Sequence, residues 1–120
     1  IVVSGGAKQS LCNVILSVIN PGDEVVIPTP AGVSYGERVK LAEGTNVLVP
    51  ASIEQDFKVT PAQLEAAITP ATRAIILCSP SNPTGSVYTQ EELEEQERSE
   101  REASQWLAEN NDFKPIGGEW

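Results

Sequence analysis

The sequence contains no histidine and no methionine among its 120 residues, and aromatic side chains make up only 5% of it. Without histidine, neither a Ser-His nor a Cys-His catalytic pair can form. The two cysteines, Cys12 and Cys78, lie in apolar runs without a CxxC pattern, so we expect no metal site. Because no initiator methionine is present, we expect the chain to begin inside a longer reading frame or after processing.

Long apolar runs and clusters of basic residues are also missing. No stretch approaches the roughly 18 apolar residues of a membrane span. Residues 1–4 lack the basic start of an export signal, so we expect a cytoplasmic protein that does not bind membranes. The net charge is −9, and seven glutamates fall within residues 91–102. Neither half of the chain offers the basic face that nucleic-acid binding requires.

Helical and strand-like patterns alternate along the first three quarters of the chain. The period of the apolar residues predicts a helix over 7–18, whose buried stripe would be Leu11, Val14, Ile15, Val18 and Ile19. Further helices are predicted over 33–43 and 61–68, and another opens at Thr89. Short apolar runs over 24–28, 47–49 and 73–78 predict three buried strands. Strands separated by helices indicate right-handed crossovers, a parallel sheet and an α/β fold.

The ends of the predicted helices carry recognisable signals. Val33, Val39 and Leu41 are the apolar members of the second helix, and Gly44 is placed to stop it. Thr60, Pro61 and Gln63 form a capping box with proline at the first helical position.

The pattern weakens in the last quarter of the chain. Residues 94–102 supply no apolar stripe, although Glu94 with Arg98 and Glu97 with Arg101 are spaced to pair. We therefore expect a helix that is solvated on nearly all sides or only partly formed, followed by a loop-rich tail from Trp106. The chain divides accordingly into a domain over 1–95 and a charged tail over 96–120.

Two loops could hold a ligand. The turn at residues 4–9 opens the first helix, and its amides could hold a phosphate, with Lys8 as a nearby charge; it could equally be an ordinary helix entry. The loop at residues 79–85 follows the third strand, at the sheet edge where ligands of α/β proteins bind. There Asn82 could contact a ring oxygen of a cofactor, but the loop could equally be a tight turn without a ligand.

An ordered series of motifs resembles the class I, aspartate-type aminotransferases, which are pyridoxal-phosphate (PLP) enzymes of fold type I. The series covers about residues 1–95 and comprises Gly6-Ala7-Lys8-Gln9, Asn20-Pro21-Gly22-Asp23-Glu24-Val25, Pro30 followed by Val33-Ser34-Tyr35, Ala67-Ile68-Thr69-Pro70 and Ser79-Pro80-Ser81-Asn82-Pro83-Thr84-Gly85. The resemblance implies part of a three-layer sandwich with a mainly parallel sheet. It also implies amino-group transfer between an amino acid and a 2-oxo acid. Because a partial sheet would expose the faces that a longer chain covers, we also expect a homo-oligomer, such as a homodimer, or aggregation.

The resemblance assigns site residues and also shows what is missing. It implies that Gly6, Ala7 and Lys8 bind the PLP phosphate and that Asn82 bonds to the 3′ oxygen of the ring. The family's aromatic pair, whose tryptophan stacks on the cofactor ring, is replaced here by Ala31-Gly32. No lysine lies in the Ser-x-Ser/Thr-Lys context of the family's Schiff base, so we predict no catalytic residue and a chain that is inactive alone.

Two alternatives remain open at this stage. The chain could be a non-catalytic module that oligomerises through its open sheet edges and binds phosphate. It could also be a small hydrolase with Ser34, Ser79 or Ser81 as nucleophile, although it has no histidine and no Gly-x-Ser-x-Gly motif. The substrate amino acid is not encoded in these residues.

Overall fold

The computed structural model describes residues 1–110 and contains one three-stranded sheet. Its strands are β1 (Glu24–Thr29), β2 (Thr45–Pro50) and β3 (Thr72–Ile75), in the order β2-β1-β3. Both neighbours run parallel to β1. The predicted α/β class with a parallel sheet is therefore confirmed. The third strand is shorter than predicted, because regular pairing ends at Ile75, and the next amide, of Ile76, donates to the Val26 carbonyl oxygen at 3.0 Å.

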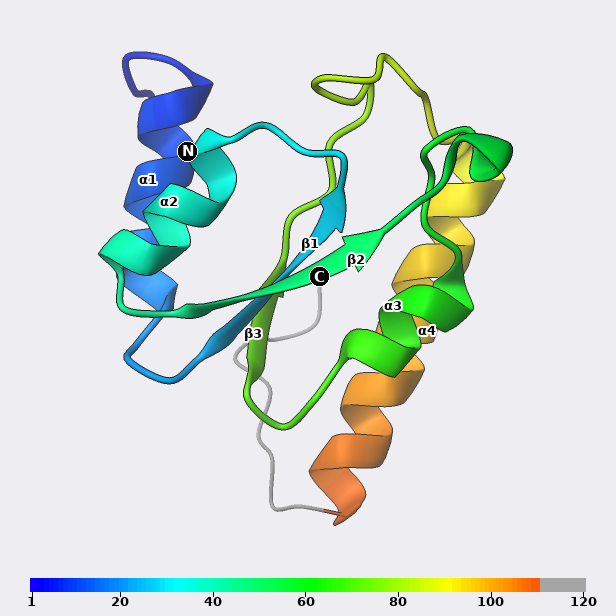
Figure 1. Ribbon diagram of the computed structural model, residues 1–120. Coiled ribbons are helices and arrows are strands. Elements are labelled where there is room, and N and C mark those ends of the chain that lie inside the picture. The colour runs from blue at the N-terminus through cyan, green and yellow to red at the C-terminus, as the bar shows by residue number, and fades with distance from the viewer. Residues whose placement is uncertain (111–120) are drawn as a thin grey trace.

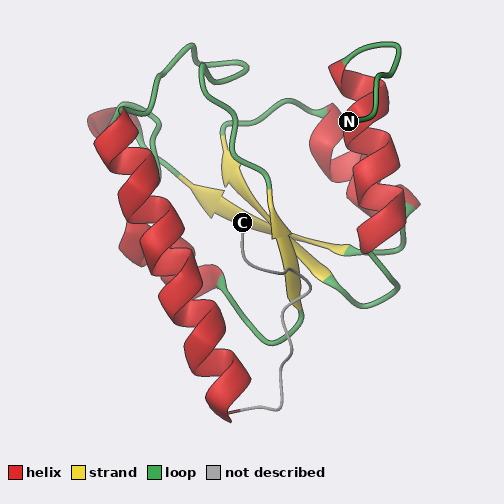
Figure 2. Ribbon diagram, turned by 180° about the vertical axis from the view of Figure 1, so that it is seen from behind, coloured by secondary structure: helices red, strands yellow, loops and turns green. Residues whose placement is uncertain are grey.

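The helices cover both faces of the sheet and give three layers (Figures 1 and 2). Helices α1 (Ala7–Val18) and α2 (Ser34–Leu41) lie on one face, and α3 (Pro61–Ala67) and α4 (Gln90–Asn110) lie on the other. A short 3-10 helix, η1 (Ile53–Gln55), precedes α3. Among the described elements the layers are those of a partial three-layer sandwich.

The central strand β1 anchors both layers because its side chains alternate between the two faces. Val25 and Ile27 join the core cluster beneath α1 and α2, while Val26 joins the cluster beneath α3. All three are at most 2% exposed. A strand covered on both faces explains why its sequence is an uninterrupted apolar run.

The boundaries of α1 are those predicted, but its buried stripe is narrower. Ile15 and Ile19 are buried, and Leu11 and Val18 pack against them in part. Val14 is 57% exposed, so its assignment to the buried stripe was wrong. The second half of α1 therefore packs against the core, while its first turn is exposed.

The second helix differs from its prediction at both ends. It begins at Ser34 and ends at Leu41, and Val33 and Leu41 are exposed, so only Val39 of the three predicted apolar members is buried. The left-handed residue after the helix is Glu43, with φ 62°. Gly44 does not supply that conformation; it lets the chain pass close to buried side chains, since a Cβ there would lie 2.7 Å from Cγ2 of Ile19.

The third helix starts as its sequence predicts. The Thr60 side chain accepts a hydrogen bond from the Gln63 amide, and the Gln63 side chain accepts one from the Thr60 amide. Pro61 occupies the first turn. This capping box fixes the point where the chain turns into α3, and Leu64 then enters the core at 1% exposure.

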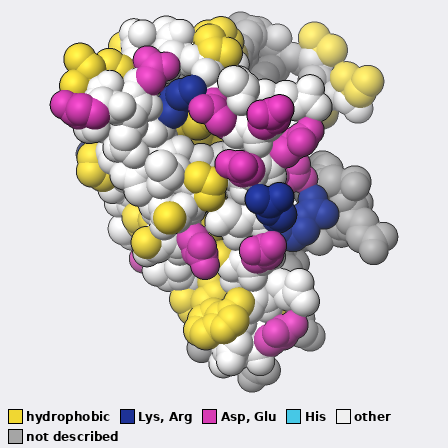
Figure 3. All heavy atoms as spheres, turned by 90° about the vertical axis from the view of Figure 1, so that its right-hand side faces the viewer, with side chains coloured by type: hydrophobic (Ala, Val, Ile, Leu, Met, Phe, Trp, Pro, Cys, Tyr) yellow, Lys and Arg dark blue, Asp and Glu magenta, His cyan; other side chains and the backbone are white. Residues whose placement is uncertain are grey.

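The fourth helix is continuous through Asn110. Of the two alternatives for residues 94–102, the helix solvated on nearly all sides is the one that forms, with Gln96 as its buried residue. The loop-rich tail predicted from Trp106 is wrong over residues 106–110, which are helical. Gln96 and Leu107 are buried, and the helix packs along α3, while acidic side chains gather on the outer face (Figure 3). The predicted division at residue 95 falls inside this helix and stays a prediction. The remainder of the predicted tail, residues 111–120, lies outside the described residues.

Of the two predicted ion pairs on α4, one forms. Arg101 donates to Glu97 at 2.6 Å, whereas the carboxylate of Glu94 accepts a hydrogen bond from Gln90. Both interactions are on the solvent face, where exposed pairs add little stability.

Candidate functional site

The loop after β3 is held by its own backbone and by side-chain hydroxyls. The Ser81 amide donates to the Ser86 carbonyl oxygen at 2.8 Å, and the Gly85 amide donates to that of Ser81 at 2.9 Å. Gly85 adopts φ 77°, a conformation that favours glycine. The Tyr88 amide donates to Oγ of Ser79 at 3.1 Å. Asn82 therefore sits on a loop whose shape is set without a ligand.

Asn82 is exposed and lies at the edge of a small pocket that also involves Ala31, Tyr35 and Cys78. Within the described residues its side-chain amide has no hydrogen-bond partner. A Cβ added to Gly32 would lie 3.4 Å from its Nδ2 atom. The pocket measures about 20 Å³, which is room for about one water molecule.

Tyr35 is one of the side chains that line this pocket. Its hydroxyl donates to Sγ of Cys78 at 3.5 Å, and the Cys78 thiol lies 3.3 Å from the Pro80 carbonyl oxygen. The hydrogen bond to Cys78 and burial raise the pKa of Tyr35 above its ordinary value. Tyr35 is therefore neutral near pH 7 and acts here as a packing and hydrogen-bonding group.

The glycine turn lies at the exposed start of α1. Gly6 precedes the helix with φ 122°, and no side chain caps it. Oε1 of Gln9 accepts from the Gly5 amide, and the Gln9 amide donates to the Gly6 carbonyl oxygen at 3.1 Å. The first two helical amides, of Ala7 and Lys8, have no acceptor within residues 1–110. An uncapped helix start with free amides and no acidic residue in its first turn suits an anion.

The two predicted half-sites lie toward the same end of the sheet, the end to which β1 points (Figure 1). No hydrogen bond or shared pocket joins residues 6–8 with Asn82 among the described residues. The loop after β3 thus lies at the predicted edge, and the turn before α1, for which no edge was predicted, lies at the same end as a separate surface.

The serines proposed as alternative nucleophiles have no base beside them. Oγ of Ser34 accepts from the Arg38 guanidinium at 2.8 Å, and Oγ of Ser79 accepts from the backbone. The part of the chain that the structure describes also contains no cluster of three or more potential metal-binding cysteine, aspartate or glutamate side chains. Nucleophilic hydrolysis and metal catalysis therefore gain no support from this arrangement.

Residues 1–102 match the family model for aminotransferase class I and II. The chain belongs to this family. It is 55% identical over 94 residues to the aspartate/prephenate aminotransferase of Nitrosomonas europaea, covering 78% of this chain and 24% of that protein. It is 54% identical over 95 residues to a bifunctional aspartate aminotransferase and glutamate/aspartate-prephenate aminotransferase of Petunia hybrida, covering 79% and 20%.

Solved aminotransferases share the fold. The aspartate aminotransferase from Thermus thermophilus with maleate superimposes with a TM-score of 0.79 at 43% identity, over 82% of this chain and 26% of that one. The aspartate aminotransferase from Rhizobium meliloti gives 0.78 at 43% identity, over 80% and 24%. The chain thus spans about a quarter of the length of these relatives. No described helix is long and apolar enough to cross a membrane.

The residues present fit the PLP of this family only in part. The free amides at the start of α1 suit the phosphate group. The pocket beside Asn82 is too small for a pyridine ring, and Ala31 and Gly32 offer no aromatic face to stack on it. A ring would have to lie on the surface outside the pocket.

Proposed function

We propose that this chain supplies part of the cofactor-binding domain of a PLP-dependent aminotransferase, with Gly6, Ala7 and Lys8 holding the phosphate and Asn82 contacting the ring oxygen. Bound PLP carries the amino group between an amino acid and a 2-oxo acid; these residues bind and orient it. The observation that carries the proposal is the uncapped start of α1, whose two free amides face no acceptor from residues 1–110. The family match supports the same assignment.

The chain by itself is proposed to be inactive because no lysine is placed for the chemistry. Lys40 pairs with Glu37 on α2, and Lys58 pairs with Glu92. Lys8 stands at the exposed start of α1, and Lys114 lies outside the described residues. A transaminase needs a lysine that forms an imine with the cofactor and moves a proton.

The test is a titration of the purified chain with PLP, followed by borohydride reduction and mapping of labelled lysines by mass spectrometry. Replacement of Gly6 by valine should abolish saturable labelling, because a side chain at φ 122° is strained and disturbs the amides. Gly22→Val is the matched control: Gly22 also has positive φ, 88°, and open space around it, but lies outside both loops. Asn82→Ala should weaken labelling without changing stability.

Pyridoxal without its phosphate separates site binding from random lysine modification. Saturable labelling by PLP but not by pyridoxal supports a phosphate-binding turn. Equal, scattered labelling by both compounds, unaffected by Gly6→Val, would refute the proposed half-site.

We also propose that the chain forms a homo-oligomer. Strands β2 and β3 are both edges of the three-stranded sheet, and Leu48 on β2 is 60% exposed. Open, partly apolar edges favour pairing with another chain. Sedimentation should show a dimer or larger species, weakened by Leu48→Glu but not by the same change at Ile53, which is 69% exposed outside the sheet. A monodisperse wild-type monomer would contradict this.

A further inference from the structure

Tyr88 ends the loop that carries Asn82, and it is buried although its neighbours in the chain are exposed. Its side chain is 7% exposed and, like Asn82, lines the small pocket after β3. Val87 and Thr89 on either side of it are exposed. The ring belongs to neither of the two core clusters. Tyr88 therefore turns inward from a stretch of surface chain and packs beside the pocket, outside the main core.

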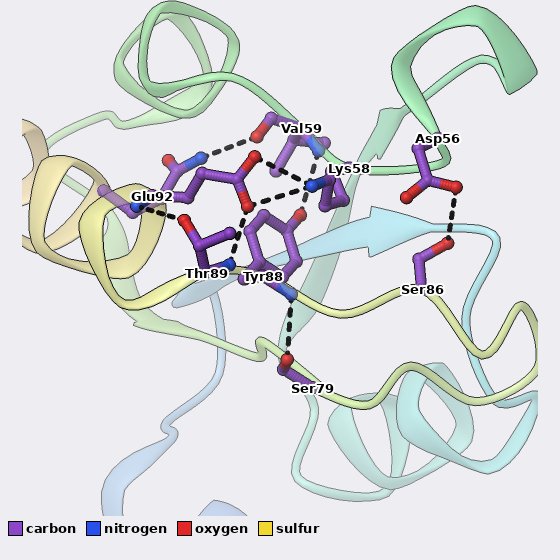
Figure 4. Close-up of polar contacts among 9 residues, drawn as sticks. Asp56, Lys58, Val59, Ser79, Ser86, Tyr88, Thr89 and Glu92 are labelled. Atoms are coloured by element: carbon purple, nitrogen blue, oxygen red, sulfur yellow. Dashed lines mark hydrogen bonds and ion pairs between the residues drawn. The ribbon is translucent and has the colours of Figure 1, made fainter.

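Hydrogen bonds hold Tyr88 at both its backbone and its side chain (Figure 4). Its amide donates to Oγ of Ser79 at 3.1 Å, which closes the loop at its base. Its hydroxyl oxygen accepts from the Val59 amide at 2.9 Å. The two ends of the loop are thereby joined, and the joined ends are fastened to the segment that precedes α3.

The anchor at Val59 is fixed by its own packing. The Val59 side chain is 2% exposed and belongs to the core cluster beneath α3. The segment before it is folded on itself, and the Phe57 amide donates to the Ser52 carbonyl oxygen at 3.0 Å. Because a close-packed core yields little, the bond from Val59 fixes the Tyr88 side chain relative to the sheet and α3.

Two further contacts join the same two segments, and both are weaker constraints (Figure 4). The Ser86 hydroxyl donates to Oδ1 of Asp56 at 3.4 Å, which is long for a hydrogen bond. Lys58 pairs with Glu92 at 2.8 Å, but both side chains are partly exposed. The bond between Val59 and Tyr88 is buried, so it is the contact that we expect to hold the loop most firmly.

Backbone bonds inside the loop carry this constraint to Asn82. The Ser81 amide donates to the Ser86 carbonyl oxygen at 2.8 Å, and the Gly85 amide donates to that of Ser81 at 2.9 Å. Asn82 follows Ser81 directly, and its side chain has no hydrogen-bond partner within residues 1–110. Its position therefore depends on the shape of the loop. A loop loosened at its base would open more often and let Asn82 move.

We propose that Tyr88 is a positioning residue for Asn82: its bonds to Ser79 and Val59 hold the loop so that the Asn82 amide stays at the edge of the pocket. Tyr88 itself makes no contact with the cofactor in this proposal and acts through Asn82. The importance of this position for cofactor binding rests on the proposed function, in which Asn82 contacts the ring oxygen.

The first test needs no ligand and uses NMR of the full chain. Tyr88→Phe keeps the ring but removes the acceptor of the buried bond. It should shift the side-chain amide signals of Asn82 and speed hydrogen exchange at the Ser81 and Gly85 amides about five- to tenfold. Unchanged Asn82 signals and unchanged exchange rates would overturn the proposal.

Gln96→Met is the matched control. Nε2 of Gln96 donates to the Val59 carbonyl oxygen at 2.6 Å, so this variant also removes a buried bond to Val59, but the lost partner lies on α4 and not in the loop. It should leave the Asn82 signals unchanged; equal changes in both variants would show general destabilisation and refute a positioning role. If Tyr88→Phe does not fold, Ser79→Ala, which removes the acceptor of the Tyr88 amide, is measured in its place with the same expected result.

The second test measures binding of pyridoxine 5′-phosphate, which keeps the phosphate and ring hydroxyl of PLP but cannot form an imine. Tyr88→Phe should weaken it severalfold in the wild-type background but less than about twofold in the Asn82→Ala background. Binding of inorganic phosphate should not change. Equal weakening in both backgrounds would overturn the proposal, because Tyr88 would then not act through Asn82. An Asn82→Ala variant that binds pyridoxine 5′-phosphate as well as wild type does would instead refute the proposed ring contact, and the NMR result alone would then decide the positioning role.

Discussion

Gly44 offers a sharp test of how the first layer is packed. Its backbone does not require glycine, but a Cβ at this position would lie 2.7 Å from Cγ2 of Ile19 and 3.0 Å from Cγ1 of Val39. Both neighbours are buried, at 6% and 0% exposure, so neither can move freely. Overpacking a core costs about 1–3 kcal/mol, and alanine returns about 0.4–1 kcal/mol by restricting the unfolded chain. We expect Gly44→Ala to lower the free energy of unfolding by about 1–2 kcal/mol.

A double-mutant cycle tests whether the close approach to Ile19 causes this loss of stability. Stability is measured by urea unfolding followed by circular dichroism. Ile19→Leu keeps the side-chain volume but moves the branch and removes Cγ2, so it should relieve part of the clash. The cost of Gly44→Ala should then fall by at least about 0.5 kcal/mol in the Ile19→Leu background. A stabilising Gly44→Ala change, or strict additivity of the two substitutions, would show that close approach is not why glycine stands here.

Further predictions concern the second layer. Leu64→Ala should cost about 2–5 kcal/mol of unfolding free energy, because Leu64 is 1% exposed in the core beneath α3, whereas Leu48→Ala at 60% exposure should cost far less; similar costs in thermal or urea melts would contradict this packing. The lowered pKa of Glu92 means that its bond to Lys58 stabilises the fold above about pH 4.5 and fades as the pH falls through the folded-state pKa. The difference in urea midpoint between wild type and Glu92→Gln should therefore be present at pH 7 and shrink as the pH falls below about 4.5; a difference that grows in acid would reverse this reasoning.

Local signals in the sequence predict most of the helices and strands correctly, because the packing of these elements in the fold agrees with the local signals. The apolar run of β1 predicts a strand buried on both faces, and the structure buries Val25, Val26 and Ile27 on alternating sides. The Thr60 and Gln63 capping box predicts the start of α3 to the residue. Both signals are short-range, and no tertiary contact opposes them.

Local signals did not predict the length of α4, because the buried face of this helix contains both polar and apolar residues. Gln96, Ser99, Ala103 and Leu107 follow helical spacing, and Gln96 and Leu107 are buried. Two of these four side chains are polar, so the apolar period disappears from the sequence. The polar members are accommodated by backbone acceptors that only the fold supplies: Gln96 donates to Val59, and the Ser99 hydroxyl lies 3.5 Å from the Pro61 carbonyl oxygen.

The sequence predicts the sheet edge for the loop after β3 but gives no position for the turn before α1. The structure brings both to the same end of the sheet, and each is stabilised by its own hydrogen bonds. Gly32, at the position of the family's aromatic pair, leaves Asn82 beside a pocket of about 20 Å³. The amides of Ala7 and Lys8 can hold an anion without help from Asn82. We therefore expect this chain to bind phosphate even if it does not bind the cofactor ring. An anion titration should therefore protect the backbone amides of Ala7 and Lys8 from hydrogen exchange while leaving Asn82 unchanged.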